Sequence, residues 1–140
     1  SKKVQPVCNN KDLELVVEIQ EELPLIVADE DRIEQVLINL VDNAIRYSPE
    51  GSKVIIKVRP AKEGVIVSVK DSGPGIPQDE LPFIWERFYK VDKSRERKKS
   101  GTGLGLAIVK KIIELHNGRV WAQNCDEGGT EFSFYLPSKV

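Results

Sequence analysis

Two runs of alternating β-branched residues constrain the fold of this chain more than any other feature of its sequence. In residues 54–58 and 65–69, every second position is valine or isoleucine. A period of two is typical of a β-strand that buries one face. The segment 60–64 between the runs contains proline and glycine, so we expect an antiparallel hairpin with a longer loop.

Four other segments are expected to be strands. Residues 13–19 alternate at period two, and a short apolar run and two C-terminal runs resemble strands as well. The four segments are 13–19, 25–28, 119–124 and 130–136. The last two are joined through Glu127-Gly128-Gly129, which suits a turn.

Helices are expected between these strands. Asp29 suits an N-cap, the residues after it are apolar at helical spacing, and Ser48-Pro49-Glu50-Gly51 ends the helix. A second long helix is predicted over 104–115, ended by Asn117-Gly118, and a short one within 79–87. Blocks of strands separated by long helices indicate an α+β fold, with a mixed, mostly antiparallel sheet and helices packed on one face.

The length and composition are those of a single globular domain. The chain has 140 residues, of which 40% are apolar and 31% charged, and its formal net charge is −1. This balance favours neither nucleic acid nor a membrane surface, and no apolar run approaches the about 18 residues of a membrane span. We therefore expect a cytoplasmic domain that contacts neither.

The chain lacks methionine even at position 1, which leads us to expect a piece of a longer protein. Residues 1–11 show no periodicity and are expected to be linker from a preceding domain, with the domain itself at 12–140. Cys8 and Cys125 are too few and too far apart for a disulfide framework or a C-x-x-C metal site, so we expect two reduced thiols.

One side of the first long helix carries several polar residues. A helical wheel groups Gln35, Asn39, Asp42, Asn43 and Arg46. They could form a solvated face, but asparagine is a poor helix former and two occur here one turn apart. Carboxamide oxygens are ligands that Mg²⁺ accepts, with water and phosphate oxygens completing its shell. A magnesium site is therefore the alternative.

Asp71 continues the alternation of the preceding strand, so its carboxylate is expected on the buried side of the sheet. It could cap its own Asp-Ser-Gly-Pro-Gly turn. It could instead accept a hydrogen bond from a ligand amine, such as the exocyclic amine of adenine. Thr130 has the parity of the inward residues of its own strand and could complete the same polar cluster.

A glycine-rich run, Ser100-Gly101-Thr102-Gly103-Leu104-Gly105-Leu106, leads into the second long helix. Its glycines allow close backbone approach, and the free N–H groups of a helix N-terminus suit phosphate. It is neither the dinucleotide fingerprint, which follows a strand, nor the P-loop. The preceding residues 87–99 are rich in Lys and Arg and form either solvated surface or a screen for triphosphate charge. Because 90–100 lacks hydrophobic periodicity, we expect a loop that is either mobile or ordered by a ligand.

Four motifs in this order resemble the N, first glycine, F and second glycine boxes of sensor histidine kinases. They are Asn39-Leu-Val-Asp-Asn43-Ala-Ile-Arg46-Tyr47, Asp71-Ser-Gly73-Pro-Gly75, Trp85-Glu-Arg-Phe88-Tyr89-Lys90 and Gly101-Thr-Gly103-Leu-Gly105-Leu. The resemblance covers roughly residues 12–137. It implies a two-layer α/β sandwich that takes ATP and Mg²⁺.

The resemblance also implies roles for individual residues. Asn43 would coordinate Mg²⁺ with Asn39 close by, Arg46 would contact phosphate, and Tyr47 would pack on the nucleotide. Asp71 would bind the adenine amine, beside Gly73, Gly75, Ile76 and Thr130. Phe88, Tyr89 and Lys90 would hinge a lid, and the phosphates would meet Gly101, Thr102, Gly103, Leu104, Gly105 and Leu106. Asn43, Arg46 and Lys90 are the expected catalytic residues. Lys90 stands where arginine is commoner, and lysine cannot form a bidentate fork.

The family transfers the γ-phosphoryl group of ATP to a histidine. In related ATPases, such as type II topoisomerases and heat-shock-90 chaperones, a glutamate four residues before the Mg²⁺-binding asparagine activates water. Asn39 occupies that position here, and an amide cannot take up the proton. We therefore expect an ATP-dependent protein-histidine kinase, with an ATP-hydrolysing domain or an anti-sigma serine kinase as alternatives.

The single histidine, His116, lies at a predicted helix end and is expected to be structural. The phosphoacceptor is then expected on a histidine-bearing dimerisation domain of the same protein, which passes the phosphoryl group to a response regulator. The isolated domain is expected to be monomeric, and to be the cytoplasmic portion of a sensor, membrane-anchored or not.

Overall fold

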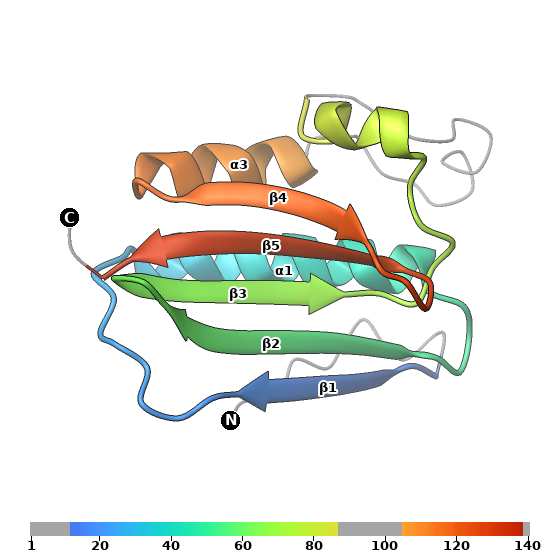
Figure 1. Ribbon diagram of the computed structural model, residues 1–140, viewed down its shortest axis with the longest axis horizontal. Coiled ribbons are helices and arrows are strands. Elements are labelled where there is room, and N and C mark those ends of the chain that lie inside the picture. The colour runs from blue at the N-terminus through green and yellow to red at the C-terminus, as the bar shows by residue number, and fades with distance from the viewer. Residues whose placement is uncertain (1–11, 87–104, 139–140) are drawn as a thin grey trace.

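The computed structural model describes residues 12–86 and 105–138, which form one five-stranded sheet with its helices (Figure 1). The strands are β1 (Glu14–Ile19), β2 (Lys53–Ala61), β3 (Gly64–Lys70), β4 (Arg119–Asn124) and β5 (Thr130–Pro137), in the spatial order β1-β2-β3-β5-β4. β1 is parallel to β2, and the other neighbouring pairs are antiparallel. The predicted mixed, mostly antiparallel sheet is confirmed.

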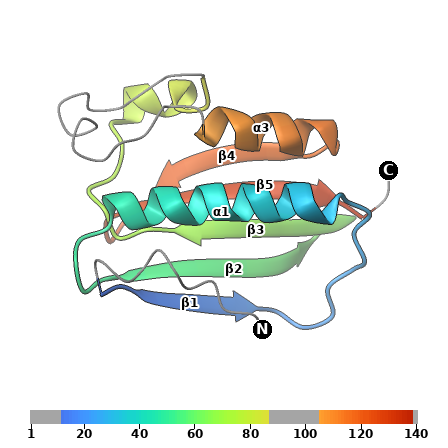
Figure 2. The ribbon, with the colours of Figure 1, turned by 180° about the vertical axis from the view of Figure 1, so that it is seen from behind.

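Two helices, α1 (Glu30–Tyr47) and α3 (Gly105–Leu115), cover one face of the sheet, as the view from the helix side shows (Figure 2). A short 3₁₀ helix, η2 (Gln78–Phe83), lies where the sequence predicts a short helix. The inward residues of β2, β3 and β5 pack against α1 and α3, and Phe132, Phe134 and Leu40 are among the largest fully buried side chains. The predicted two-layer arrangement is therefore confirmed.

The ends of the long helices follow the predicted signals. Asp29 caps α1 by accepting a hydrogen bond from a first-turn backbone N–H, 3.2 Å from its Oδ1. At the end of α3, Asn117 has a left-handed φ of 66°. The N–H of Gly118 donates to the carbonyl of Ile113 at 2.9 Å, and that of Asn117 to Glu114 at 3.0 Å. This pair of bonds is a Schellman motif, which stops the helix.

The expected strand at 25–28 is wrong. The structure has no strand there, and the segment only connects β1 with α1. Its exposure does alternate, since Leu25 is 90% exposed and Val27 is 68% exposed while Ile26 packs on the core, but the segment pairs with no strand among the described residues. A four-residue apolar run is too short for periodicity to distinguish a strand from an extended connection.

The loop of the β2–β3 hairpin is shorter than predicted. Pro60 and Ala61 belong to β2 and pair with Val65 and Gly64, so the turn is confined to residues 62–63. The proline does not end the strand here, because a strand tolerates proline where its missing N–H is not needed for the ladder.

Some predictions fall outside the described ranges. They are the linker at 1–11 with Cys8, the loop at 90–100, and the start of the second helix at 104.

His116 connects the two helices. Its Nδ1 lies 2.8 Å from the carbonyl oxygen of Ile112, and its Nε2 accepts a hydrogen bond from the backbone N–H of Asp29 at 3.1 Å. The two contacts require a neutral ring with its proton on Nδ1. The imidazole therefore ties the end of α3 to the N-cap of α1, in agreement with a structural role.

We expect His116→Ala to lower the free energy of unfolding by about 1–2 kcal/mol, because it removes two hydrogen bonds and leaves a backbone N–H without its acceptor. Urea denaturation measures the change. Glu114→Ala, an exposed site on the same turn, is the control and should change stability by about 0.5 kcal/mol or less. Equal effects of the two substitutions would contradict the proposed connection.

Candidate functional site

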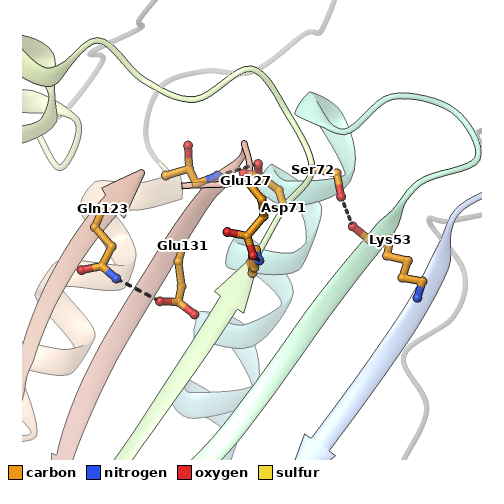
Figure 3. Close-up of polar contacts among 8 residues, drawn as sticks. Lys53, Asp71, Ser72, Gln123, Glu127 and Glu131 are labelled. Atoms are coloured by element: carbon orange, nitrogen blue, oxygen red, sulfur yellow. Dashed lines mark hydrogen bonds and ion pairs between the residues drawn. The ribbon is translucent and has the colours of Figure 1, made fainter. Parts of the chain in front are cut away.

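The candidate site lies where β3, β4 and the C-terminal half of α1 reach the same end of the sheet (Figure 1). Asp71 follows directly after β3, and Thr130 begins the antiparallel strand β5 beside it. In the close-up, Asp71 stands at the tip of β3, and Ser72 next to it reaches Lys53 of β2 (Figure 3). The segment between β3 and η2 therefore passes over this end of the sheet.

Asp71 is buried, with an exposed fraction of 4%. Its Oδ1 accepts hydrogen bonds from the backbone N–H groups of Gly73, at 2.9 Å, and Thr130, at 3.0 Å. Its own N–H donates to the carbonyl of Thr130 at 2.9 Å. Burial raises the pKa of the Asp71 carboxyl, and the two backbone donors offset part of that rise.

The bond from Gly73 is the turn cap predicted as one role of Asp71. It occupies only Oδ1, and within residues 12–86 and 105–138 no group donates to Oδ2. No fully buried side-chain polar atom of those residues lacks a partner, so Oδ2 must retain some access from outside. A carboxylate with one oxygen fixed and the other open suits a ligand that donates one hydrogen bond.

The turn after Asp71 lies tightly against α1. A Cβ at Gly73 would be 2.5 Å from the carbonyl oxygen of Tyr47, which only glycine avoids. The buried hydroxyl of Ser48 accepts a hydrogen bond from the backbone N–H of Ser72 at 3.0 Å. The end of α1 and the turn are therefore in direct contact, through the Ser48 hydroxyl and through the close approach at Gly73.

Asn124 is a site residue that sequence reasoning missed. Its carboxamide bonds to both backbone groups of Ile76, and it also accepts a bond from the hydroxyl of Thr130 at 3.3 Å. The sequence did contain a signal for it. Asn124 alternates in step with Val120 and Ala122, which pack on the core, so its side chain belongs to the same face of β4. Ser48 and Gly129 were missed as well.

The side of α1 that carries Asn39 and Asn43 lies toward the start of α3. Asn39 donates a long hydrogen bond of 3.5 Å to the carbonyl of Gly105. Asn43, one turn further on, is half-buried, and no residue of the described ranges bonds to its carboxamide. Arg46 forms an ion pair of 3.0 Å with Asp42 on the preceding turn, and both side chains are 35% exposed. Such a pair contributes little to stability and can exchange partners.

The structure thus brings together part of the predicted set. Direct contacts join Tyr47, Asp71, Gly73 and Thr130, and Asn124 links Thr130 to Ile76 beside Gly75. Among the described residues, no side-chain hydrogen bond joins this set to the carboxamide of Asn43, which lies one turn before Tyr47 on α1. Phe88, Tyr89, Lys90 and residues 101–104 lie outside the described ranges, and Leu106, half-buried near the start of α3, packs against the core.

The described residues contain no cluster of three or more His, Cys, Asp or Glu side chains that could hold a metal. Burial raises the pKa of the free Cys125 thiol, which favours its protonated form over the thiolate. None of the helices in the described ranges has the length and apolar character of a membrane span.

Comparison with known proteins extends these findings. Residues 28–140 match the family model described as histidine kinase-, DNA gyrase B-, and HSP90-like ATPase. The sensor histidine kinase WalK of Bacillus subtilis is 44% identical over 138 residues, which cover 97% of this chain and 21% of that protein. The adaptive-response sensory kinase SasA of Rippkaea orientalis is 39% identical over 132 residues, covering 94% of this chain and 33% of SasA. The chain therefore spans about a fifth to a third of these relatives.

Solved structures resemble the chain over its whole fold. The catalytic domain of histidine kinase ThkA has a TM-score of 0.80 and 37% identity, and the match covers 94% of this chain and 83% of that one. Full-length ShkA, in complex with AMPPNP, has a TM-score of 0.79 and 33% identity over 93% of this chain and 26% of ShkA. The first match covers most of both chains, so the likeness concerns the entire domain rather than one motif.

Proposed function

Because the chain belongs to the histidine kinase-, DNA gyrase B-, and HSP90-like ATPase family, as a catalytic domain of the histidine-kinase type, we propose that it donates the γ-phosphoryl group of ATP to a histidine of a separate domain. We assign this catalytic domain to residues 12–140 and the linker to 1–11. The acceptor would be a histidine-bearing dimerisation domain of the same protein, which then supplies a response regulator.

The open oxygen of Asp71 is the observation that carries this proposal. Adenine presents an exocyclic amine, and Oδ2 is an acceptor at the end of the sheet with no donor among the described residues. We assign the base to the space beside Asp71 and the turn at 73–76. A solved relative, ShkA, is in complex with AMPPNP, which supports a nucleotide of this kind as the ligand.

We place the phosphates between α1 and the start of α3. Asn39 bonds across these two helices, and the N–H groups at the N-terminus of a helix generally favour anions. Arg46 would exchange its ion pair with Asp42 for phosphate. By resemblance to the family, the residues from Gly101 to Leu106 would meet the phosphates, and Phe88, Tyr89 and Lys90 would hinge a lid.

The half-buried carboxamide of Asn43 fits Mg²⁺, because it has an unused oxygen and Mg²⁺ usually takes few protein ligands. When bound, Mg²⁺ neutralises charge on the β- and γ-phosphates during transfer. The protein itself would orient the γ-phosphorus. The P–O bond to ADP breaks as a P–N bond to the imidazole forms, and an acidic neighbour on the acceptor domain takes the imidazole proton.

We expect the chain to bind Mg-ATP but to hydrolyse it slowly, because Asn39 cannot act as a base toward water. Here the amide is also engaged with Gly105. Phosphate release is measured with and without the histidine-bearing domain. Turnover like that of a dedicated ATPase, independent of the acceptor domain, would favour the hydrolytic alternative.

The decisive experiment supplies γ-labelled ATP to the chain together with the histidine-bearing domain of its own protein. We expect acid-labile label on that domain, since phosphohistidine is acid-labile, and none without the catalytic chain. Asn43→Asp is the matched variant, because a carboxylate beside the triphosphate disturbs metal and phosphate binding. Acid-stable label on a serine would instead support the anti-sigma type of kinase.

A further inference from the structure

The side chain of Asn124 makes the two hydrogen bonds that the backbone of a neighbouring strand residue would normally make. Asn124 ends β4, where it lies opposite Thr130. Its Oδ1 accepts a hydrogen bond from the N–H of Ile76 at 2.8 Å, and its Nδ2 donates to the carbonyl of Ile76 at 2.7 Å. These are the two bonds that a paired residue of an antiparallel strand would exchange with Ile76. A residue 48 positions away in the sequence therefore satisfies both polar groups of this peptide unit.

The turn at 73–76 depends on this contact because residues 71–77 have no helix or strand. Gly75 has a φ of 88°, and a Cβ at this position would lie 3.1 Å from Oδ1 of Asn124. The glycine therefore provides both the backbone conformation and the space that Asn124 needs. We note no other side chain in the described ranges that bonds to Ile76.

The contacts of Asn124 continue to Asp71. The hydroxyl of Thr130 donates to Oδ1 of Asn124 at 3.3 Å. The backbone of Thr130 in turn donates to the Asp71 carboxylate at 3.0 Å and accepts from the Asp71 N–H at 2.9 Å. Asp71 and Ile76 flank residues 72–75, and hydrogen bonds through Thr130 and Asn124 connect the two.

We propose that Asn124 is a positioning residue for the base of the nucleotide: it holds Ile76 at a fixed place relative to Asp71, so that the base meets an acceptor and an apolar side chain at once. This inference rests on the proposed function, in which Asp71 accepts from the adenine amine. Ile76 is half-buried and packs on the core, so a shift of its backbone would move the apolar wall of the base site. Among the described residues, the side chain of Asn124 forms no hydrogen bond with α1 or α3, so the groups that we assign to the phosphates should be unaffected.

Asn124→Ala tests this role in the chain itself. We expect the dissociation constants of both Mg-ATP and ADP to rise by the same factor, about ten-fold, which corresponds to about 1.4 kcal/mol and to two neutral hydrogen bonds. Titration calorimetry measures both constants. Amide exchange at Ile76 should accelerate, while exchange in the β3–β5 ladder stays unchanged.

Two further variants separate hydrogen bonding from bulk and from general effects. Asn124→Asp keeps the size of the side chain but turns an oxygen toward the carbonyl of Ile76, so its loss of affinity should equal or exceed that of Asn124→Ala. Gln123→Ala is the matched control, because the amide of Gln123 bonds to Glu131 on the neighbouring strand at 3.4 Å (Figure 3). It should leave both dissociation constants unchanged.

The outcomes distinguish this inference from the proposed function. If the wild-type chain binds neither ATP nor ADP, the proposed function fails. If the wild type binds both and Asn124→Ala binds them equally well, or loses affinity for ATP alone, the positioning role is overturned and the proposed function stands. Lower stability of Asn124→Ala with unchanged affinity would show a merely structural contact and would also overturn it.

Discussion

Asp71→Asn is expected to weaken ATP binding by about 10- to 150-fold, which corresponds to the about 1.5–3 kcal/mol of a hydrogen bond to a charged group. Asparagine keeps one oxygen for the N–H groups of Gly73 and Thr130, so the turn cap survives. Its other group is an amide NH₂, which presents a donor to the donating amine of adenine. The preference for ATP over GTP should therefore weaken as well.

The same substitution should not destabilise the free domain at neutral pH. Burial raises the pKa of Asp71 above its ordinary value of 3.8, so the folded state binds this proton more tightly than the unfolded chain. At a pH between the pKa of Asp71 in the unfolded chain and its higher pKa in the folded domain, the folded state binds more protons than the unfolded state. The free energy of unfolding therefore falls as the pH rises from the first pKa to the second. Asp71→Asn removes this contribution, so the mutant should gain stability relative to the wild type from acid to neutral pH.

Titrations with ATP and GTP, and urea denaturation on both sides of the window, measure the two effects. Asp126→Asn is the control for the loss of one negative charge, since Asp126 is exposed in the β4–β5 turn. An unchanged ATP/GTP ratio in folded Asp71→Asn would remove Asp71 from the site. If Asp71→Asn binds ATP less tightly but has a higher free energy of unfolding, the Asp71 carboxylate serves ligand binding rather than stability.

Gly129→Ala is expected to lower the free energy of unfolding by about 2–6 kcal/mol. Gly129 has a φ of 90°, which costs about 1–3 kcal/mol in a residue with a side chain. The added Cβ would also overlap the backbone carbonyl of Asp71, and overpacking typically costs another 1–3 kcal/mol, approximately. Because the overlapped atom is backbone, it can yield only by moving Asp71, so ATP binding should weaken too.

Gly128→Ala is the matched control for this prediction. Gly128 has a φ of 103°, but a Cβ there would meet nothing within 4 Å, so only the backbone strain remains. Urea denaturation of the two variants isolates the overlap as the difference between them. If Gly129→Ala is no less stable than Gly128→Ala, the close approach of the β4–β5 turn to Asp71 is not present in solution.

The local sequence pattern was sufficient to predict most of the helices and strands and to single out Asp71, the central residue of the candidate site. Five of the six predicted strands and both long helices occur where periodicity and capping signals place them, because each signal acts over a few neighbouring residues. The parity of Asp71 with the valines of β3 correctly predicted its burial. The order of the motifs identified the family, which sequence relatives support.

Tertiary structure alone decided how the site is assembled. Which strand lies beside β3 depends on the spatial order of the sheet, and that order brings Thr130 to Asp71 and Asn124 to Ile76. Gly129 approaches Asp71 for the same reason, whereas Ser48 reaches Ser72 because the end of α1 packs against the turn. Their contacts join residues 24 and more positions apart, which no local period encodes. The segment 25–28 failed as a strand because a strand requires a hydrogen-bonding neighbour, and only the folded chain determines whether one is there.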